Sequence, residues 1–505
     1  MKRLLLGVDL GTGGCKVMAI DAIGSTAAQA SQEYKTLHPQ SGWAEQAPAD
    51  WLAAAASCIK SVVSKVGSSN VGAIGVTAPT HNAVLLDDRG VPVRNSIIWT
   101  DQRSASIAAA LGSSNPEIFR KTWQAPSPTW TLPQLMWLRA HEPGAFSKAS
   151  NILFGKDYVR YWLTGKYNTD RVDAQGSMLV DMAADEWAKD LCGLVPLAAS
   201  MLPQIIEPTA IAGYVTEKAS AETGLLAGTP VIAGTSDTAA ECFGAGVHSC
   251  GLGVVKLATA GTICIFSETA TPNPKALTYG HVVPGLWYNC LATNSAAHSV
   301  RWFRDTFLSA EKQAYELIDL EVQSVGPGAD GLLYHPYLMG ERSPHWNPDL
   351  CASFTGVRAH HTRGHFARAV MEGVAFSLRD CLGAYTGAEP PTAWRLIGGG
   401  AESKVWPQII ANILDRSVQC VASGSAAFGV ALLAGVGVGT FSSFEEAVQV
   451  GVSPTRTFEP QLTFRNMYRS YYEYYRSVQA KLAPAYAELS DMRKKAEELQ
   501  GEKID

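Results

Sequence analysis

The stretch LLLGVDLGTGGCKVMAID, residues 4–21, decides the fold of this chain. Two apolar runs, Leu4–Leu10 and Cys15–Asp21, flank a glycine-rich turn and predict a pair of neighbouring strands. A hairpin that only has to turn needs two residues such as Asn-Gly. The segment from Asp9 to Gly14 instead contains an acid, a hydroxyl and three glycines. This excess over what folding requires indicates chemistry at the turn.

Length and composition predict large, well-buried domains. The chain has 505 residues, too many for one compact core, so we expect two or three domains. Charged residues make up 17%, below the roughly 25% usual in globular proteins, which argues against disorder. The formal net charge of −5 gives no electrostatic reason to expect nucleic acid or an anionic membrane as a partner.

The cysteines and the apolar segments predict a cytoplasmic protein. The ten cysteines are scattered and form no CxxC pair, as expected of free thiols in a reducing compartment. The N-terminal apolar run meets Asp9 too early for a secretory signal. The weakly polar stretch Ser425–Gly439 is shorter than a membrane span, so it predicts a buried helix.

The order of expected elements repeats. A second pair of apolar strands, broken by Thr-Ala-Gly-Thr, covers Gly251–Glu268 and has the plan of the opening hairpin. This repetition predicts an α/β protein with two similar lobes facing a cleft, at residues 1–246 and 247–460, followed by a helical tail at 461–505. Other expected elements are a helix over Gly42–Val66, strands at Val71–Pro79, Ala83–Asp87, Asn151–Phe154 and Gly228–Gly234, and a strand, glycine turn and helix over Thr392–Arg416.

The opening turn has the residue types of a phosphate site. Glycines allow backbone amides to converge on phosphate oxygens, and Thr12 adds a hydroxyl donor. Asp9 ends a buried strand, where a carboxylate can hold a hydrated magnesium ion. The alternative is a glycine-rich hairpin with a capping aspartate.

The pattern DxGTxxxK resembles the first phosphate loop of the actin-like, ribonuclease-H-like ATPases. Further stretches resemble one branch of them, the FGGY carbohydrate kinases, which phosphorylate glycerol, pentuloses, gluconate and related polyols. The matching stretches span nearly the whole chain and include IIWTDQRS, VIAGTSDTAAECFGAG, GERSPHW, RAVMEGVAF and LIGGGAESKVW. Within the family, the chain is most similar to the xylulokinase-like pentulose kinases.

The resemblance implies two ribonuclease-H-like lobes around a catalytic cleft that binds ATP and Mg²⁺. Asp9 would hold the metal, beside a first phosphate loop. A second phosphate loop lies in TAGTICIF, and LIGGGAESKVW would lie against the adenosine and α-phosphate. A tight strand–helix turn is the alternative for that last stretch. The residues implied to bind nucleotide are Gly11, Thr12, Gly13, Lys16, Thr259, Gly261, Thr262, Gly399, Gly400, Ala401, Ser403 and Gln408.

Asp237 is the expected catalytic base. It follows a short strand and precedes a run of small residues that starts a helix, where a carboxylate can project into a cleft. Taken alone, an aspartate at this place is more often a helix N-cap. The catalytic aspartate of the family falls on this position, and phosphoryl transfer needs a base near the attacking hydroxyl.

The stretch WTDQR is interpreted as a clamp for the sugar. Trp99 can offer an apolar face, Asp101 can accept from hydroxyls and Arg103 can orient Asp101; a helix N-terminus with a charge pair and a core tryptophan is the alternative. A lone histidine is usually structural, but xylulokinase-like members use a Met-His pair where this chain has Thr80-His81. Together with Asn82, this departure leaves the sugar open.

The expected activity is transfer of the γ-phosphate of ATP to a ketopentose, with D-xylulose giving D-xylulose 5-phosphate. Ribulose, erythritol, glycerol and gluconate are alternative acceptors. An actin- or chaperone-like ATPase would not need WTDQR or His81, and a sensor without turnover would not need both Asp9 and Asp237. A homodimer is the habit of the family.

Overall fold

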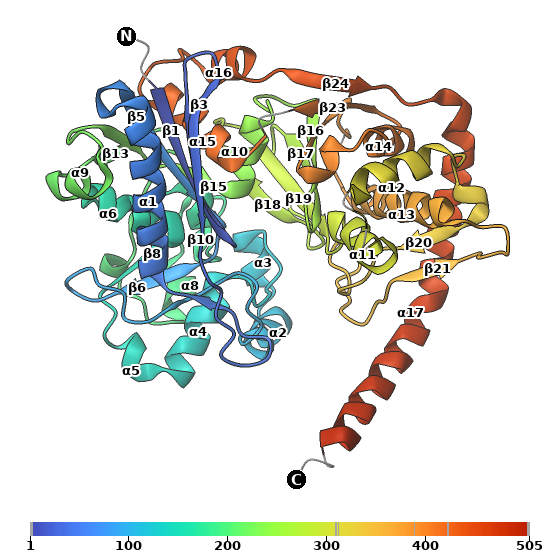
Figure 1. Cartoon of the computed structure of the whole chain (residues 1–505). Helices are drawn as coiled ribbons and strands as arrows, with labels where there is room; N and C mark the ends of the chain where they lie inside the picture. Colours follow the sequence, from blue (N-terminus) through green and yellow to red (C-terminus); the bar gives the residue numbers. More distant parts are fainter. Residues whose placement is uncertain (1–3, 309–310, 312, 388, 422–423, 502–505) are drawn as a thin grey trace.

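The chain folds into two α/β halves, each built on a seven-stranded sheet (Figure 1). The structure is a computed structural model that describes residues 4–501 apart from 309–310, 312, 388 and 422–423. The two-lobed architecture expected from the repeated hairpin is therefore confirmed. All ten cysteines are free thiols, as their scattered spacing predicts.

The first sheet is organised around the opening hairpin. Strand β1 (Leu4–Gly11) pairs antiparallel with β2 (Gly14–Ile20) and parallel with β5 (Val71–Ala78). The remaining strands of this sheet are β3 (Thr26–Glu33), β13 (Ile211–Tyr214), β14 (Pro230–Ile232) and β15 (Thr235–Ser236). Helix α1 (Pro48–Val66) packs on one face of the sheet, against β2 and β3.

The second sheet repeats the plan. Strand β16 (Leu252–Leu257) pairs antiparallel with β17 (Gly261–Ser267) and parallel with β22 (Ala393–Ile397). The outer strands are β18 (Leu277–Gly280), β19 (Trp287–Thr293), β23 (Ser417–Val421) and β24 (Pro454–Phe458). The order β19-β17-β16-β22-β23 has the same directions as β3-β2-β1-β5-β14.

Alternation along β1 explains why an acid interrupts its apolar run. Leu6, Val8 and Leu10 pack into the core that contains α1. The intervening residues Gly7 and Asp9 point to the opposite face because successive side chains of a strand alternate. A Cβ added to Gly7 would lie 1.8 Å from the carbonyl oxygen of Ala427, so this face is covered closely by a helix.

That helix comes from the other half of the sequence. Helix α15 (Ala426–Gly437) is the buried helix expected over Ser425–Gly439, and it packs on β1 and β5 and against α10 (Asp237–Gly244). One hydrophobic core therefore contains residues of both sheets. The division at residue 246 stays a prediction, but the two halves share this helix pair.

One predicted helix begins later than expected. The helix predicted from Gly42 begins at Pro48, because Glu45–Gln46 forms a short strand, β4, that pairs with β7 (Ser96–Ile97). Proline has no amide proton to donate and suits the first turn of a helix, whereas the residue before it is held extended. Helix α17 (Arg465–Gly501) lies within the predicted helical tail and projects from the body (Figure 1), and residues 502–505 of that prediction lie outside the described residues. In the part of the chain that is described, no helix is both long and apolar enough to span a bilayer.

Candidate active site

The first loop is a two-residue turn, Thr12-Gly13, closed by the pair Gly11 and Gly14. A Cβ on Gly14 would lie 2.6 Å from the carbonyl oxygen of Gln32, so packing against β3 explains this glycine. A Cβ on Gly13 would meet nothing within 4 Å. The fold does not need a glycine at 13, and the open space above it suits a phosphate.

Side chains from three other segments hold this turn. The Tyr34 hydroxyl donates to the carbonyl oxygen of Gly11, and the Gln46 amide donates to the carbonyl oxygen of Thr12 at 2.7 Å. The Trp99 indole N–H donates to the Thr12 hydroxyl oxygen at 3.0 Å. Because that oxygen accepts from Trp99, the Thr12 proton is free to be donated to an anion.

Asp237 is the first residue of α10 and is not its cap. The capping side chain is Ser236, whose hydroxyl accepts from the amide of Ala239. The N-cap interpretation of Asp237 is therefore excluded. Among the described residues, its carboxylate accepts only from Thr238, from the amide at 2.6 Å and from the hydroxyl at 3.2 Å.

Asp9 lies near α10, beside the junction of the two halves. Burial, reinforced by the charges of Asp237 and Glu241, raises the pKa of Asp9 to about 8, although Lys256 and Lys16 oppose the shift. Its Oδ1 atom is buried and has no hydrogen-bond partner among the described residues. A carboxylate oxygen without a partner, in a site where negative charge accumulates, fits a divalent cation.

The donor set suits magnesium held mainly through nucleotide. Among the described residues, no three histidine, cysteine or acidic side chains converge closely enough to hold a metal without other ligands. Mg²⁺ is usually bound by one or two carboxylates together with phosphates and water. Asp9 therefore fits the single protein carboxylate of such a site, and its role as metal ligand stays a prediction.

His81 lies where the sequence places it, in the turn between β5 and β6 (Ala83–Leu86), and has the left-handed φ of +80°. Its Nδ1 lies 2.6 Å from the carbonyl oxygen of Gly176, so this nitrogen carries the proton, and Nε2 accepts from the Thr80 hydroxyl at 2.7 Å. Burial lowers the pKa of His81 to about 4. The ring is therefore neutral near pH 7, and Nε2 can reach a sugar only by exchanging its bond to Thr80.

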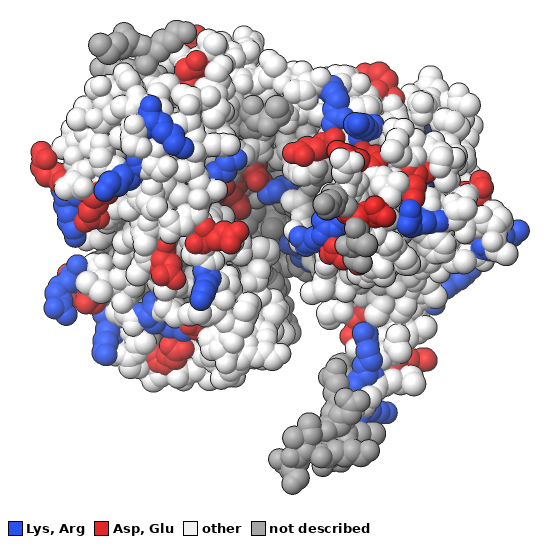
Figure 2. Space-filling view, viewed as in Figure 1, with Lys and Arg blue, Asp and Glu red and all other residues white. Residues whose placement is uncertain are grey.

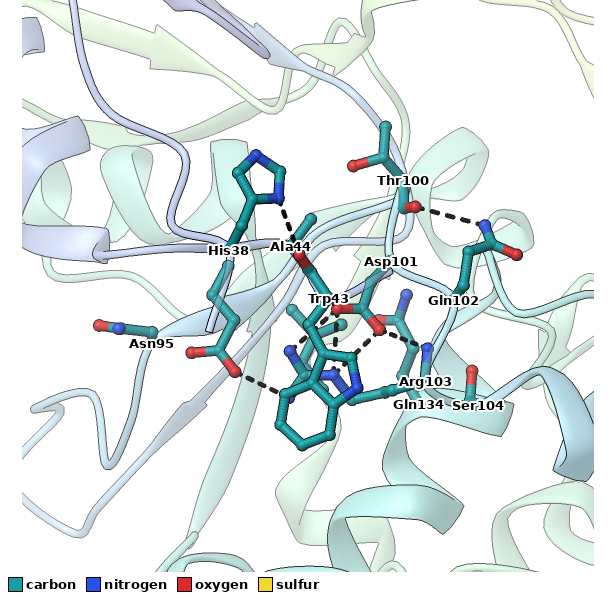
Figure 3. A network of polar contacts seen from close by, with 12 residues as sticks. His38, Trp43, Ala44, Asn95, Thr100, Asp101, Gln102, Arg103, Ser104 and Gln134 are labelled. Carbon is teal, nitrogen blue, oxygen red and sulfur yellow. Dashed lines mark hydrogen bonds and ion pairs between the residues drawn. The ribbon is translucent and has the colours of Figure 1, made fainter. Parts of the chain in front are cut away.

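Asp101 and Arg103 form a closed network (Figure 3). The Asp101 oxygens accept from the Arg103 side chain at 2.9 Å and from the amides of Ala44 and Arg103. Arg103 also contacts Glu45 at 2.7 Å and stacks over the Trp43 ring. Both side chains are buried, so in this conformation they brace the loop that carries Trp99. A direct contact with sugar stays a prediction for both.

The second loop, Ala258–Ala260, joins β16 to β17. The carbonyl oxygen of Thr259 accepts from the amides of Ala296 and His298, which fixes the loop to the start of α11 (Ala297–Phe307). A Cβ on Gly261 would lie 2.9 Å from the side chains of Ala296 and Thr293, so packing explains that glycine. Thr259 and Thr262 keep solvent-accessible surface and stay predicted phosphate donors.

The glycine turn after β22 is partly explained by packing. Gly398 has a left-handed φ of +86°, and a Cβ on Gly400 would lie 2.6 Å from that of Leu257. Only Gly399 faces open space, with nothing within 4 Å of an added Cβ. Packing therefore does not explain Gly399, and the open space beside it suits a ligand.

Three neighbours of this turn have structural partners. The Ser403 hydroxyl donates to Asp319 at 2.7 Å and accepts from the amide of Trp406, at the start of α14 (Trp406–Leu414). The Gln408 amide donates to Asn412 and to the carbonyl oxygen of Glu459. Ala401 is buried, and its carbonyl oxygen accepts from Arg456. Contacts of these residues with nucleotide stay predictions.

Figure 2 shows a hollow seam between the two halves in which acidic and basic side chains lie. Comparison with known proteins accounts for this arrangement. Residues 4–244 match the N-terminal domain of the FGGY family of carbohydrate kinases, and residues 257–438 match its C-terminal domain. The chain belongs to this family. It is an ATP-dependent sugar kinase with the two-lobed fold of the actin-like ATPases.

Similar proteins cover the kinase over almost its full length. The xylulose kinase of Bacillus subtilis is 30% identical over 97% of this chain and 100% of that protein. The xylulose kinase of Lactococcus lactis is 32% identical, covering 89% of this chain and 90% of that protein. The crystal structure of xylulose kinase from Rhodospirillum rubrum superposes with a TM-score of 0.89 at 29% identity, covering 96% of this chain and 100% of that one.

Two residues beside the site of this kinase, Glu241 and Lys256, were not expected from the sequence. Glu241 and Lys256 form an ion pair, with the Lys256 ammonium 2.6 and 2.7 Å from the two Glu241 oxygens. Glu241 could have been found, because it follows Asp237 by four residues and so lies on the same face of a helix. Nothing in the sequence spacing indicates that Lys256, on the other sheet, meets it.

Replacing Trp99 by phenylalanine is expected to lower kcat/KM for ATP of this kinase by about tenfold, which corresponds to loss of one hydrogen bond. The ring remains, but the donor to Thr12 is lost, so the Thr12 hydroxyl no longer has a fixed orientation. Steady-state kinetics with ATP varied measure the effect. Trp162→Phe is the matched control, because its indole donates to the exposed side chain of Glu222. Equal kcat/KM values for the two variants would contradict a role of the Trp99–Thr12 hydrogen bond in the use of ATP.

Proposed function

We propose that this kinase transfers the γ-phosphate of Mg²⁺-ATP to D-xylulose and forms D-xylulose 5-phosphate. Two xylulose kinases that are at least 30% identical over most of the chain support this substrate. His81, which is retained from the Met-His pair of xylulokinase-like members although Thr80 replaces the methionine, lies in the same half as Asp237 and supports a sugar substrate.

The observation that carries the proposal is the placement of Asp237. The residue is not needed as a cap, and its charge acts in two directions, on Asp9 at the metal side and on the buried Tyr279 hydroxyl. The pKa of Tyr279 lies well above its usual range chiefly because of burial, followed by Cys290, with smaller effects from Asp173 and Asp237 and an opposing one from the Thr80 hydroxyl. Tyr279 in turn packs near Trp130, whose ring meets His81 edge to face with centroids 4.7 Å apart. Asp237 thus lies between the predicted sugar side and the predicted metal side.

The residues divide the reaction between them. Asp237 accepts the proton of the sugar hydroxyl while the hydroxyl oxygen forms a bond to the γ-phosphorus, and the bond from that phosphorus to the oxygen of ADP breaks. Asp9 would hold Mg²⁺, which neutralises phosphate charge when bound. Thr12, on one turn, and Thr262, after the other, donate to phosphate oxygens. Approach of the two halves would exclude water and limit hydrolysis of ATP.

Gluconate is the alternative acceptor that differs most in charge. Its carboxylate would require a cationic side chain in the sugar pocket. The arginine of the WTDQR stretch cannot serve, because Asp101 and Glu45 already bind the Arg103 guanidinium. The carboxylate of Asp237 near Tyr279 would repel an acid, whereas the nearby Asp173 is paired with Lys156 at 3.1 Å. Neutral ketoses and polyols therefore suit the described groups better than aldonates do.

ADP release coupled to NADH oxidation tests the proposal with D-xylulose, D-ribulose, L-ribulose, erythritol, glycerol and gluconate at equal concentrations. We expect kcat/KM for D-xylulose to exceed that for gluconate by at least about 10²-fold, the discrimination that an unpaired buried polar group produces. Phosphorus–proton couplings in the NMR spectrum of the product identify the phosphorylated hydroxyl. A preference for another neutral sugar would correct the substrate, and ADP release that is indifferent to every sugar would contradict the kinase.

A further inference from the structure

The ion pair between Glu241 and Lys256 joins the two halves at the reaction centre. Glu241 lies on α10, four residues after Asp237. Lys256 lies on β16, where it faces Thr262 of β17 in the antiparallel ladder and Ile397 of β22 in the parallel one. One partner therefore sits beside the proposed base, and the other beside the second phosphate loop.

The geometry leaves the ammonium group ready for a further acceptor. Lys256 donates two of its three N–H protons to the two oxygens of Glu241. Among the described residues, no other acceptor takes the third. The side chains are 28% and 15% exposed, so the pair is largely shielded but its ammonium is still reachable. A lysine tethered in this way can donate to a phosphate oxygen without leaving its partner.

The surrounding charge also calls for a cation that remains near the phosphate. The carboxylates of Asp9, Asp237 and Glu241 act on Lys256, and Lys16 is the other cation that acts on Asp9. The strands packed against the pair contribute Cys264 and Cys290, with Arg342 near Cys290. An arriving triphosphate adds negative charge to a group of carboxylates, so a fixed ammonium would lower the repulsion.

We propose that Lys256 contacts the phosphoryl group during its transfer and that Glu241 positions this ammonium. The inference rests on the kinase function proposed above. Lys256 keeps its proton throughout: the phosphorus exchanges its bond to the ADP oxygen for a bond to the sugar oxygen, and the hydroxyl proton goes to Asp237. Lys256 is then a catalytic residue, and Glu241 is a positioning residue.

Four variants distinguish this catalytic role from an ion pair that only holds the two halves together. Lys256→Met is expected to lower kcat by about 10²- to 10³-fold, the loss that follows removal of one transition-state donor, and to change the sugar KM by less than about threefold. Lys256→Arg keeps a cation and is expected to stay within about tenfold of wild type. Glu241→Gln, which loosens the tether, is expected to lower kcat by about tenfold. Lys275→Met is the control, because that side chain is exposed.

The decisive variant exchanges the charges, Glu241→Lys with Lys256→Glu. It keeps an ion pair between α10 and β16 but moves the ammonium to the helix. We expect kcat as low as that of Lys256→Met, with thermal unfolding near that of wild type. Recovery of wild-type kcat would overturn the proposal, because the ion pair would then only hold the two halves together.

Two further outcomes keep the inference distinct from the proposed function. Sugar-dependent turnover by wild type, with more than one tenth of kcat retained by Lys256→Met, overturns the role of Lys256 and leaves the kinase in place. Absence of sugar-dependent turnover in wild type overturns the kinase function itself. Mg²⁺-ADP titration followed by intrinsic tryptophan fluorescence shows that each variant still folds and binds nucleotide. If Lys256→Met does not fold, the kcat values of Lys256→Arg and Glu241→Gln decide. Wild-type kcat for Glu241→Gln, or a loss well beyond about tenfold for Lys256→Arg, overturns the proposal.

Discussion

Asp237→Asn is expected to lower sugar-dependent kcat by about 10³-fold, within the range for loss of a general base. An asparagine keeps the size of the side chain, and its amide oxygen can still accept from the amide of Thr238. It cannot accept the proton of the attacking hydroxyl. Because Ser236 caps α10, the helix should be retained, and thermal unfolding should stay close to that of wild type.

The measurement is coupled ADP release with the best sugar of the panel, alongside Mg²⁺-ADP binding, which we expect to be unchanged. Asp190→Asn is the matched control, since it makes the same chemical change in an exposed ion pair with Lys121. Retention of more than one tenth of kcat by Asp237→Asn would remove Asp237 from the role of base. Loss of nucleotide binding as well would indicate that Asp237 acts with Asp9 on the metal.

Asp9→Asn is expected to have opposite effects on activity and on stability. Loss of the proposed magnesium ligand should lower kcat/KM for ATP by on the order of 10²-fold. The nucleotide-free protein should become more stable at pH 8 to 9, because the variant no longer buries a carboxylate that repels Asp237 and Glu241.

The sign of the stability effect follows from linkage. The folded state holds the Asp9 proton up to about pH 8, whereas an unfolded chain releases it near the usual aspartate pKa of 3.8. The free energy of unfolding of wild type therefore falls as the pH rises from about 4 to about 8, and the loss persists above it. Asparagine has no proton to lose, so the difference between the proteins should reach on the order of a few kcal/mol at high pH and vanish near pH 4.

Urea unfolding between pH 4 and pH 9 without nucleotide measures this difference, and ATP kinetics measure the other effect. Asp21→Asn is a suitable control, since that carboxylate lies in the turn after the adjoining strand β2, where it accepts from the amides of Ile23 and Ser25. A variant that is less stable than wild type at pH 9 would contradict the burial of charge at Asp9. A variant with normal kcat/KM for ATP would contradict the metal ligand.

Much of this fold and part of the site follow from the sequence by itself. The apolar runs around Thr12-Gly13 and around Thr259 determine two hairpins, because apolar strands separated by turn residues have few other ways to bury their side chains. Asp9 and Asp237 stand out because each is a charged residue at the end of a buried strand. The buried helix at 426–437 is likewise determined by its unbroken small and apolar composition.

Only the tertiary structure decided which of these features meet. Helix α15 crosses to the first sheet because Gly7, Gly75 and Gly429 let backbones approach closely, a fit that no local pattern contains. Packing explains Gly14, Gly261 and Gly400 and leaves Gly13 and Gly399 open, although all five look alike in the sequence. The network of Asp101 and Arg103 and the pair of Glu241 and Lys256 also depend on contacts between distant segments. Sequence spacing fixes neighbours along one element, whereas the charge around a buried carboxylate is set by every element packed against it.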